Sequence, residues 1–141
     1  MEALVQKEFR NGMNSLAYYD NFQQKAFGVK IDLMEFLIQE KRCNKKVAAY
    51  GAAAKGNTLL NYCGIKNDLI SFVVDANPHK QNKYLPASHI PVVAEQVLKE
   101  EKPDFVILLP WNLKEEIMDQ ISYIRSWNGQ FVIPIPELQI F

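Results

Sequence analysis

The sequence predicts an α/β fold, in which helices cover both faces of a mostly parallel five-stranded sheet and one long helix precedes the first strand. Short apolar runs alternate with amphipathic segments from residue 46 onward, as in repeated strand–helix–strand units. The runs are rich in Val, Ile and Phe, which is typical of strands buried on both faces. With 141 residues, 48% of them hydrophobic, the chain is long enough to bury one core. We therefore expect one compact, Rossmann-like domain with three layers.

The first 45 residues predict a helical segment that packs on this domain, which then occupies residues 46–141. Apolar side chains recur at intervals of three or four residues, which predicts a long helix with one buried stripe. This stripe consists of Leu16, Tyr19, Phe22, Phe27, Ile31, Met34, Leu37 and Ile38. The polar run 41–44 predicts the end of the helix. Residues 2–14 have no evident partner surface within the chain, so we expect the sequence to begin partway into a larger protein.

The alternation of segments also predicts the topology of the sheet. The predicted strands cover residues 47–50, 69–74, 89–93, 105–109 and 130–135, and the helices between them cover 56–63, 94–101 and 113–126. Right-handed crossovers between parallel strands give the strand order 3-2-1-4-5. In such a sheet, ligands bind at the carboxyl ends of the strands, beside the switch between the first and fourth strands. The residues that follow these strands are therefore the candidates for a binding site.

The turn after the first strand is the main candidate. Its side chains are no larger than a methyl group at four successive positions, so a phosphate can approach the backbone amides at the positive start of a helix. A lysine at the mouth of this turn favours a bound anion, because a cation at a helix start is otherwise slightly unfavourable. The pattern matches only half of G-x-G-x-x-G, and tight packing between strand and helix also selects small residues. The candidate residues are Gly51, Ala52, Ala53, Ala54, Lys55, Gly56, Asn57 and Thr58.

Polar residues follow the second and fourth predicted strands. Asp75 lies near the distance from the small-residue turn at which an acidic residue accepts hydrogen bonds from a ribose, although Asp also commonly starts turns. Asn77 and Lys80 lie in the polar loop after it, where lysine can reach a phosphate or simply face solvent. Trp111 and Asn112 can stack on and hydrogen-bond a base or sugar. Asn112 can equally cap the helix that begins after it.

Composition excludes several classes of function. Sixteen basic residues balance sixteen acidic ones without a long run of like charge, which argues against nucleic-acid and membrane-surface partners. No apolar run approaches the roughly 20 residues of a membrane span, and the N-terminus does not resemble a signal peptide, so we expect a soluble, cytoplasmic protein. Two cysteines, Cys43 and Cys63, and two histidines are too few for a structural metal site. We predict no catalytic residues and no bound metal, and interpret the chain as a binder of substrate.

Several segments together resemble the C-terminal domain of S-adenosylmethionine-dependent sugar C-methyltransferases. They are Tyr50–Tyr62, Val74–Asp75, Lys80, Lys83–Pro86, His89–Val92 and Leu109–Asn112. In that family a zinc-binding segment and a methyltransferase domain precede this one, and the enzymes methylate a carbon of a deoxysugar linked to a nucleoside diphosphate. The resemblance implies that this chain helps to hold the nucleotide-linked sugar and is not competent for catalysis alone. It also implies that S-adenosylmethionine binds to the upstream methyltransferase domain, which is the expected protein partner, and that this chain holds no cofactor.

One departure from the family pattern concerns a loop. Ala87 stands where family members usually have Gly after Leu-Pro, so we expect the loop that ends at His89 to have a different shape. Two further interpretations follow from the residues themselves. One is a separate Rossmann-like module that binds NAD or coenzyme A without chemistry. The other is a structural or oligomerisation arm, whose long helix and C-terminal tail from Pro134 to Phe141 pack on a neighbour.

Overall fold

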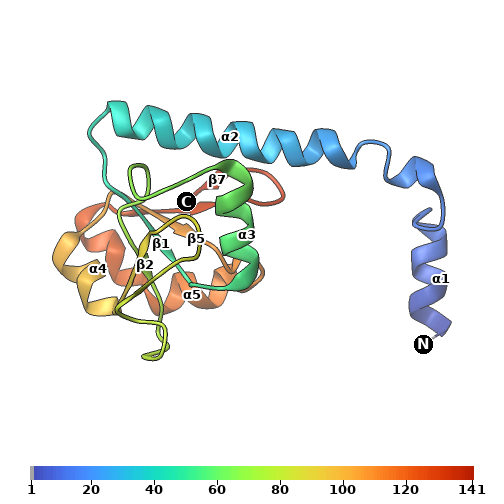
Figure 1. Cartoon of the computed structure of the whole chain (residues 1–141). Helices are drawn as coiled ribbons and strands as arrows, with labels where there is room; N and C mark the ends of the chain where they lie inside the picture. Colours follow the sequence, from blue (N-terminus) through green and yellow to red (C-terminus); the bar gives the residue numbers. More distant parts are fainter. Residues whose placement is uncertain (1) are drawn as a thin grey trace.

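A seven-stranded sheet forms the centre of the molecule in the computed structural model, which describes residues 2–141 (Figure 1). The strands lie in the order β3-β4-β2-β1-β5-β6-β7. They comprise β1 (Val47–Tyr50), β2 (Val73–Val74), β3 (Lys83–Tyr84), β4 (Pro91–Val93), β5 (Phe105–Leu108), β6 (Gln130–Ile133) and β7 (Gln139–Ile140). The helices are α1 (Glu2–Arg10), α2 (Phe22–Arg42), α3 (Ala54–Cys63), α4 (Glu95–Glu101) and α5 (Lys114–Gln120), with the 3-10 turns η1 (Leu16–Tyr18), η2 (Trp111–Leu113) and η3 (Ser122–Trp127).

The sheet is larger than the sequence predicts, so the prediction of five strands and of their full order is wrong. Five strands, β4, β2, β1, β5 and β6, are parallel to one another and form the middle of the sheet. Two short strands extend it, because β3 pairs antiparallel with β4 and β7 pairs antiparallel with β6. All four residues of β3 and β7 are exposed, and they therefore lack the apolar pattern that marks the central strands.

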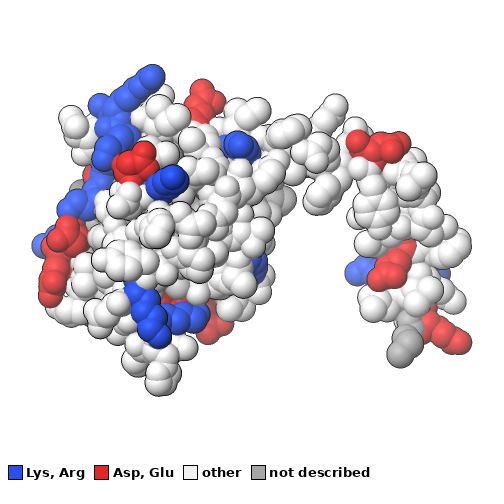
Figure 2. Space-filling view, in the orientation of Figure 1, with Lys and Arg blue, Asp and Glu red and all other residues white. Residues whose placement is uncertain are grey.

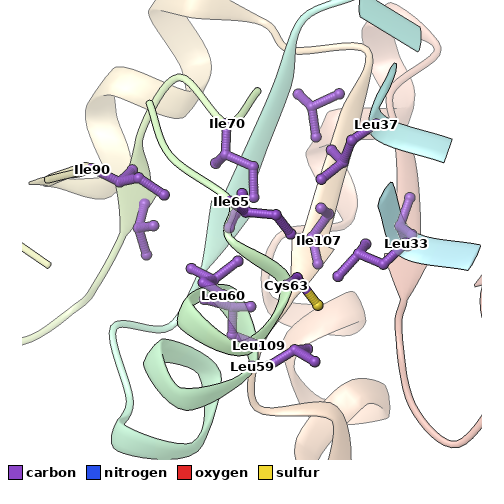
Figure 3. Packing of buried hydrophobic residues seen from close by; sticks show 14 of the residues in the cluster. Leu33, Leu37, Leu59, Leu60, Cys63, Ile65, Ile70, Ile90, Ile107 and Leu109 are labelled. Carbon is purple, nitrogen blue, oxygen red and sulfur yellow. The ribbon is translucent and has the colours of Figure 1, made fainter. Parts of the chain in front are cut away.

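Each face of the sheet carries its own core. On one face, α2 and α3 cover the sheet, and Leu33, Leu37 and Leu60 are fully buried there (Figure 3). On the other face, Leu98 of α4 packs with Ile117 of α5 and Ile124 of η3. Because successive side chains of a strand point to opposite faces, β1 supplies Val47 and Ala49 to the first core and Ala48 and Tyr50 to the second. The result is the predicted three-layer arrangement.

The N-terminal segment differs most from its prediction. It consists of two α-helices and a 3-10 turn, and α2 buries Leu33, Phe36 and Leu37 against the sheet. The predicted stripe is mostly exposed, since Leu16, Phe22 and Ile31 keep 86%, 67% and 60% of their accessible surface. The physical reason is visible in Figure 1, in which the first turns of α2 extend beyond the edge of the α/β domain. The turns that follow border a cleft and do not lie directly on the sheet. Only the second half of the helix covers the sheet.

The predicted helix over 113–126 is also interrupted. It is replaced by η2, the seven-residue α5 and η3, with Ile121 fully buried between the last two. The three pieces still place one apolar face on the sheet, so the amphipathic pattern is retained although the helix is not continuous. No helix within residues 2–141 combines the length and the apolar character that crossing a bilayer requires.

Candidate ligand site

Three segments meet at the carboxyl edge of the parallel strands. They are the turn after β1, the loop after β2 and the turn after β5. The Ala52 amide donates to Asp75 Oδ2 over 2.8 Å, and Lys80 Nζ donates to the Ala52 carbonyl over 2.9 Å and to Asp75 Oδ2 over 3.1 Å. The structure therefore brings together three of the predicted residues, one from the first segment and two from the second.

Asp75 organises this corner. Its side chain is largely buried, and its second oxygen, Oδ1, accepts a hydrogen bond of 2.8 Å from the Asn77 amide. Asn77 in turn accepts one of 2.9 Å from the His79 amide through Oδ1, so both residues stabilise the start of the loop. Both carboxylate oxygens of Asp75 thus have partners within the chain. The loop holds the turn after β1 in place.

The two glycines of the small-residue turn are required by packing. Gly51 has φ +90°, and a Cβ built there lies 2.4 Å from Pro110 Cγ. A Cβ on Gly56 lies 2.6 Å from Leu109 Cβ. The close contact between α3, β1 and the turn after β5 accordingly depends on both glycines. Tight packing alone therefore explains why glycine occurs at positions 51 and 56, without a bound ligand.

The backbone amides of the turn divide into two groups. Those of Gly51, Ala52 and Ala53 donate to the Val74 carbonyl, to Asp75 Oδ2 and to the Gly51 carbonyl. The first hydrogen bond of α3 runs from the Asn57 amide to the Ala53 carbonyl over 3.0 Å, and Ala53 provides no side-chain cap. Within residues 2–141, the amides at 54–56 consequently have no assigned acceptor. The expected cradle is therefore only three amides wide, at the start of α3.

Lys55 lies beside these amides and reaches the turn after β5. Its Nζ donates to Asn112 Oδ1 and lies 4.5 Å from the centroid of the Trp111 ring. The structure thus brings these three predicted residues together. Asn112 does not cap a helix, because it lies inside η2 and the residue before α5 is Leu113, which makes no capping hydrogen bond. The capping interpretation of Asn112 is wrong.

Asn57 and Thr58 complete the first turns of α3. Thr58 Oγ1 donates to the Ala54 carbonyl over 3.1 Å, which is a local contact within the helix. Asn57 Oδ1 is buried and has no hydrogen-bond partner within residues 2–141. A buried acceptor without a partner is unusual in a folded protein. It lies next to the three free amides in sequence.

An apolar cleft of about 860 Å³ opens beside this edge, between α2, α3 and the chain after β6. Lys55, Thr58 and Trp111 line it and connect it to the predicted site. The other residues that line it were not predicted as site residues: Phe22, Lys25, Ala26, Gly28, Val29, Asp32, Leu59, Tyr62, Ile135, Pro136 and Glu137. Only Phe22 among them belongs to the apolar stripe of the long helix, which the sequence predicts to be buried, and the others carry no sequence signal of a site.

A polar network supports the end of β1 from the other face of the sheet. The Tyr50 hydroxyl accepts a hydrogen bond of 2.8 Å from Gln120, whose amide also donates to Glu95, and Tyr123 donates to Glu95 over 2.9 Å. Burial raises the pKa of the Tyr50 hydroxyl, and the negative charge of Glu95 adds to this effect. Burial and the hydrogen bond to Glu95 raise the pKa of the Tyr123 hydroxyl strongly. Both phenols therefore stay protonated at neutral pH. The network fixes β1, α4, α5 and η3 to one another.

Comparison with known proteins decides the family. The model of the C-methyltransferase C-terminal domain matches residues 1–136. This chain belongs to that family. It is also 32% identical over 137 residues to the C-methyltransferase NovU of Streptomyces niveus, an alignment that covers 97% of this chain and 33% of NovU. The C-methyltransferase domain thus spans about a third of the length of this curated relative.

A solved structure gives a weaker likeness. The chain is similar to UDP-D-quinovosamine 4-dehydrogenase from Vibrio fischeri, with a TM-score of 0.43 and 18% sequence identity over 63% of this chain and 76% of that one.

Proposed function

We propose that this C-methyltransferase domain holds the nucleotide-linked sugar that the complete enzyme methylates. Two findings support this proposal. The chain belongs to a family of C-methyltransferase domains, and ligands of parallel α/β sheets generally bind at the carboxyl edge of the strands. The observation that carries the proposal is that the amides at 54–56 have no acceptor among residues 2–141, with Lys55 and Asn112 beside them. Together they offer hydrogen-bond donors and one positive charge at a single point of the surface.

In this proposal the diphosphate lies over the start of α3. Free amides at a helix start bind phosphate oxygens well, because the helix dipole adds to the hydrogen bonds. Lys55 would exchange its contact with Asn112 Oδ1 for a phosphate oxygen, and Asn112 Oδ1 would then be free to accept a hydrogen bond from a sugar hydroxyl. Trp111 presents a ring at the same place for a base or sugar to stack on. Asp75, Asn77 and Lys80 act by holding the turn, as their mutual contacts indicate.

The residues present do not favour a dinucleotide or the methyl donor at this edge. Such ligands use an acidic residue after the second strand to accept hydrogen bonds from ribose hydroxyls. Both oxygens of Asp75 already accept hydrogen bonds from Ala52, Asn77 and Lys80. In keeping with the family, we assign S-adenosylmethionine to the part of the enzyme outside these 141 residues, and give this chain the sugar nucleotide.

The proposal is tested by titrating the isotope-labelled chain with thymidine diphosphate and with a thymidine-diphosphate sugar. We expect the amide signals of residues 54–56 to shift most, while those of Gly51 and Ala52 shift less because their amides have partners within the chain. Lys55→Ala should weaken binding roughly tenfold, as expected from losing one hydrogen bond to a charged group. Affinity is measured from the same titration.

Lys66→Ala is the matched control, because Lys66 is exposed in the turn after α3, at the opposite end of that helix. It should bind either ligand as the wild-type chain does. If no amide signal of residues 54–58 moves at millimolar ligand, or if both lysine variants weaken binding equally, the assignment of the diphosphate to this helix start is wrong.

A further inference from the structure

Exposed apolar side chains that the rest of residues 2–141 leaves uncovered recur along the N-terminal segment. These side chains, here called the arm face, are Leu4, Val5, Phe9, Leu16, Tyr18, Tyr19, Phe22, Phe27 and Ile31, and each keeps about half or more of its surface exposed. Figures 1 and 2 show the start of this segment standing away from the α/β domain, with few charges in view on its link to α2. Exposed apolar patches of this extent mark interaction sites.

The helix at the tip of the arm face needs such a contact. Helix α1 has nine residues and none of them is buried. Isolated helices shorter than about 12–15 residues are marginal in water, since few hydrogen bonds offset the cost of nucleation. Leu4, Val5 and Phe9 nevertheless lie on the side of the helix opposite Lys7 and Arg10, as in a helix that packs on a neighbour.

The arm face belongs to the family domain. The family match begins at residue 1, and the alignment with NovU covers 97% of the chain, so a member of the family carries this segment too. The family is described as a C-terminal domain, and the chain spans 33% of NovU. About two-thirds of NovU thus lie outside the aligned part, and the description of the family as a C-terminal domain indicates that most of this remainder precedes it.

We propose that the arm face is the surface on which the preceding part of a full-length C-methyltransferase docks. Covalent connection places that part at an effective concentration near the millimolar range, whereas a second copy of the chain must associate from dilute solution. The proposal rests on family membership and not on the ligand proposal above.

The arm face is continuous with the apolar cleft. Phe22 belongs to both, and Ala26 and Val29 carry the surface of α2 onward to Lys55 and Trp111. A partner seated on the arm face would therefore adjoin the candidate ligand site and could close it from the side of α2. Docking on the arm face would then also shield the start of α3 from solvent.

The test compares this chain alone with a chimera in which it replaces the matching third of NovU. Hydrogen exchange is measured for the helical amides of α1 at residues 6–10 and, as an internal reference, for the amides of β1 and β5. We expect exchange in α1 to be at least tenfold slower in the chimera, with unchanged exchange in the two strands. A double variant, Phe22→Glu with Ile31→Glu, should remove that protection from the chimera.

Tyr84→Glu is the matched control, since Tyr84 is 67% exposed on the edge strand β3, outside the arm face. It should leave the protection of α1 unchanged. Equal exchange of α1 in the chain and the chimera would overturn the proposal. A dimer of the chain alone would also overturn the proposal, if sedimentation detects it, if its α1 amides are protected and if the double variant dissociates it. The arm face would then bind a second copy of the chain.

Discussion

Gly51 and Gly56 show how far single residues can be interpreted from sequence. Their small size predicted a place where a ligand approaches the backbone, and the structure shows that Pro110 and Leu109 occupy the space instead. Among residues 2–141, the amides that have no acceptor are those of 54–56, which include the amide of Gly56. Sequence alone could not separate the two cases, because a glycine that faces a ligand and a glycine that faces a side chain have the same pattern. The neighbouring residues decide, and Leu109 and Pro110 are far from the two glycines along the chain because they follow β5.

Asp104 provides a prediction about pH. Partial burial raises the pKa of its carboxyl, but the hydrogen bonds from Lys45 Nζ and from the Lys46 amide, both 2.8 Å, outweigh this and hold the pKa below its usual value. A lowered pKa in the folded state means that the stabilisation is complete above the unfolded value of about 3.9 and disappears as the pH falls through the folded value. We expect Asp104→Asn to melt about 2 °C lower at pH 7 and at nearly the wild-type temperature below about pH 3.

The measurement is thermal unfolding of both proteins at a series of pH values. The gap between them should be constant from about pH 5 to 8 and should narrow only in acid. It should also shrink at high salt, since both side chains are partly exposed and their attraction is screened. A gap that persists at pH 2.5 would show that the ion pair is not its cause.

At the level of elements, the sequence was informative wherever an apolar run is buried on both faces. Strands β1 and β5 coincide with the predictions to within one residue, because all eight of their residues are buried. Strands β3 and β7 were missed, since they are two residues long and stabilised by backbone hydrogen bonds at the sheet edge. Their formation depends on β4 and β6 being in place, and this is a tertiary effect without a local signal.

The loop between β3 and β4 carries a prediction of its own. Ala87 has φ 64°, which is the left-handed conformation that glycine adopts readily. The residue is exposed, so replacing it by glycine removes no buried methyl group. The left-handed conformation destabilises the folded state by about 1–2 kcal/mol when the residue is alanine. Replacement by glycine removes this cost, but it also makes the unfolded chain more flexible, which lowers stability by about 0.4–1 kcal/mol. We expect Ala87→Gly to raise the free energy of unfolding by about 0.5 kcal/mol, measured by urea denaturation.

A matched substitution in a helix should have the opposite sign. Ala26→Gly lies within α2, where glycine is less favourable than alanine by about 1 kcal/mol. Opposite effects of the two changes would show that the backbone conformation, not the loss of a methyl group, determines the result. Equal destabilisation would show that residue 87 is not left-handed in solution.

At the scale of the whole molecule, the apolar stripe of the first 45 residues predicts packing on the core of this chain, and for most of the stripe this prediction is wrong. The periodicity of the first 45 residues correctly indicated a helix, but the stripe from Leu16 to Ile31 does not face the core of this chain. Periodicity indicates that a helix has an apolar side, but it does not indicate whether the same chain or another protein surface covers that side. The structure divides the stripe near the middle of α2, where Leu33, Phe36 and Leu37 begin to pack on the sheet.

This division predicts that the arm and the domain contribute separately to stability. Removing residues 1–21 deletes no residue of either core, so we expect the free energy of unfolding of the domain to change by less than about 0.5 kcal/mol. Leu37→Ala, which removes a fully buried side chain from the second half of α2, should instead cost about 2–5 kcal/mol. Both values come from urea denaturation followed by circular dichroism. A deletion as costly as Leu37→Ala would mean that the arm folds back on the domain in solution, and the arm face would then already be covered by its own chain.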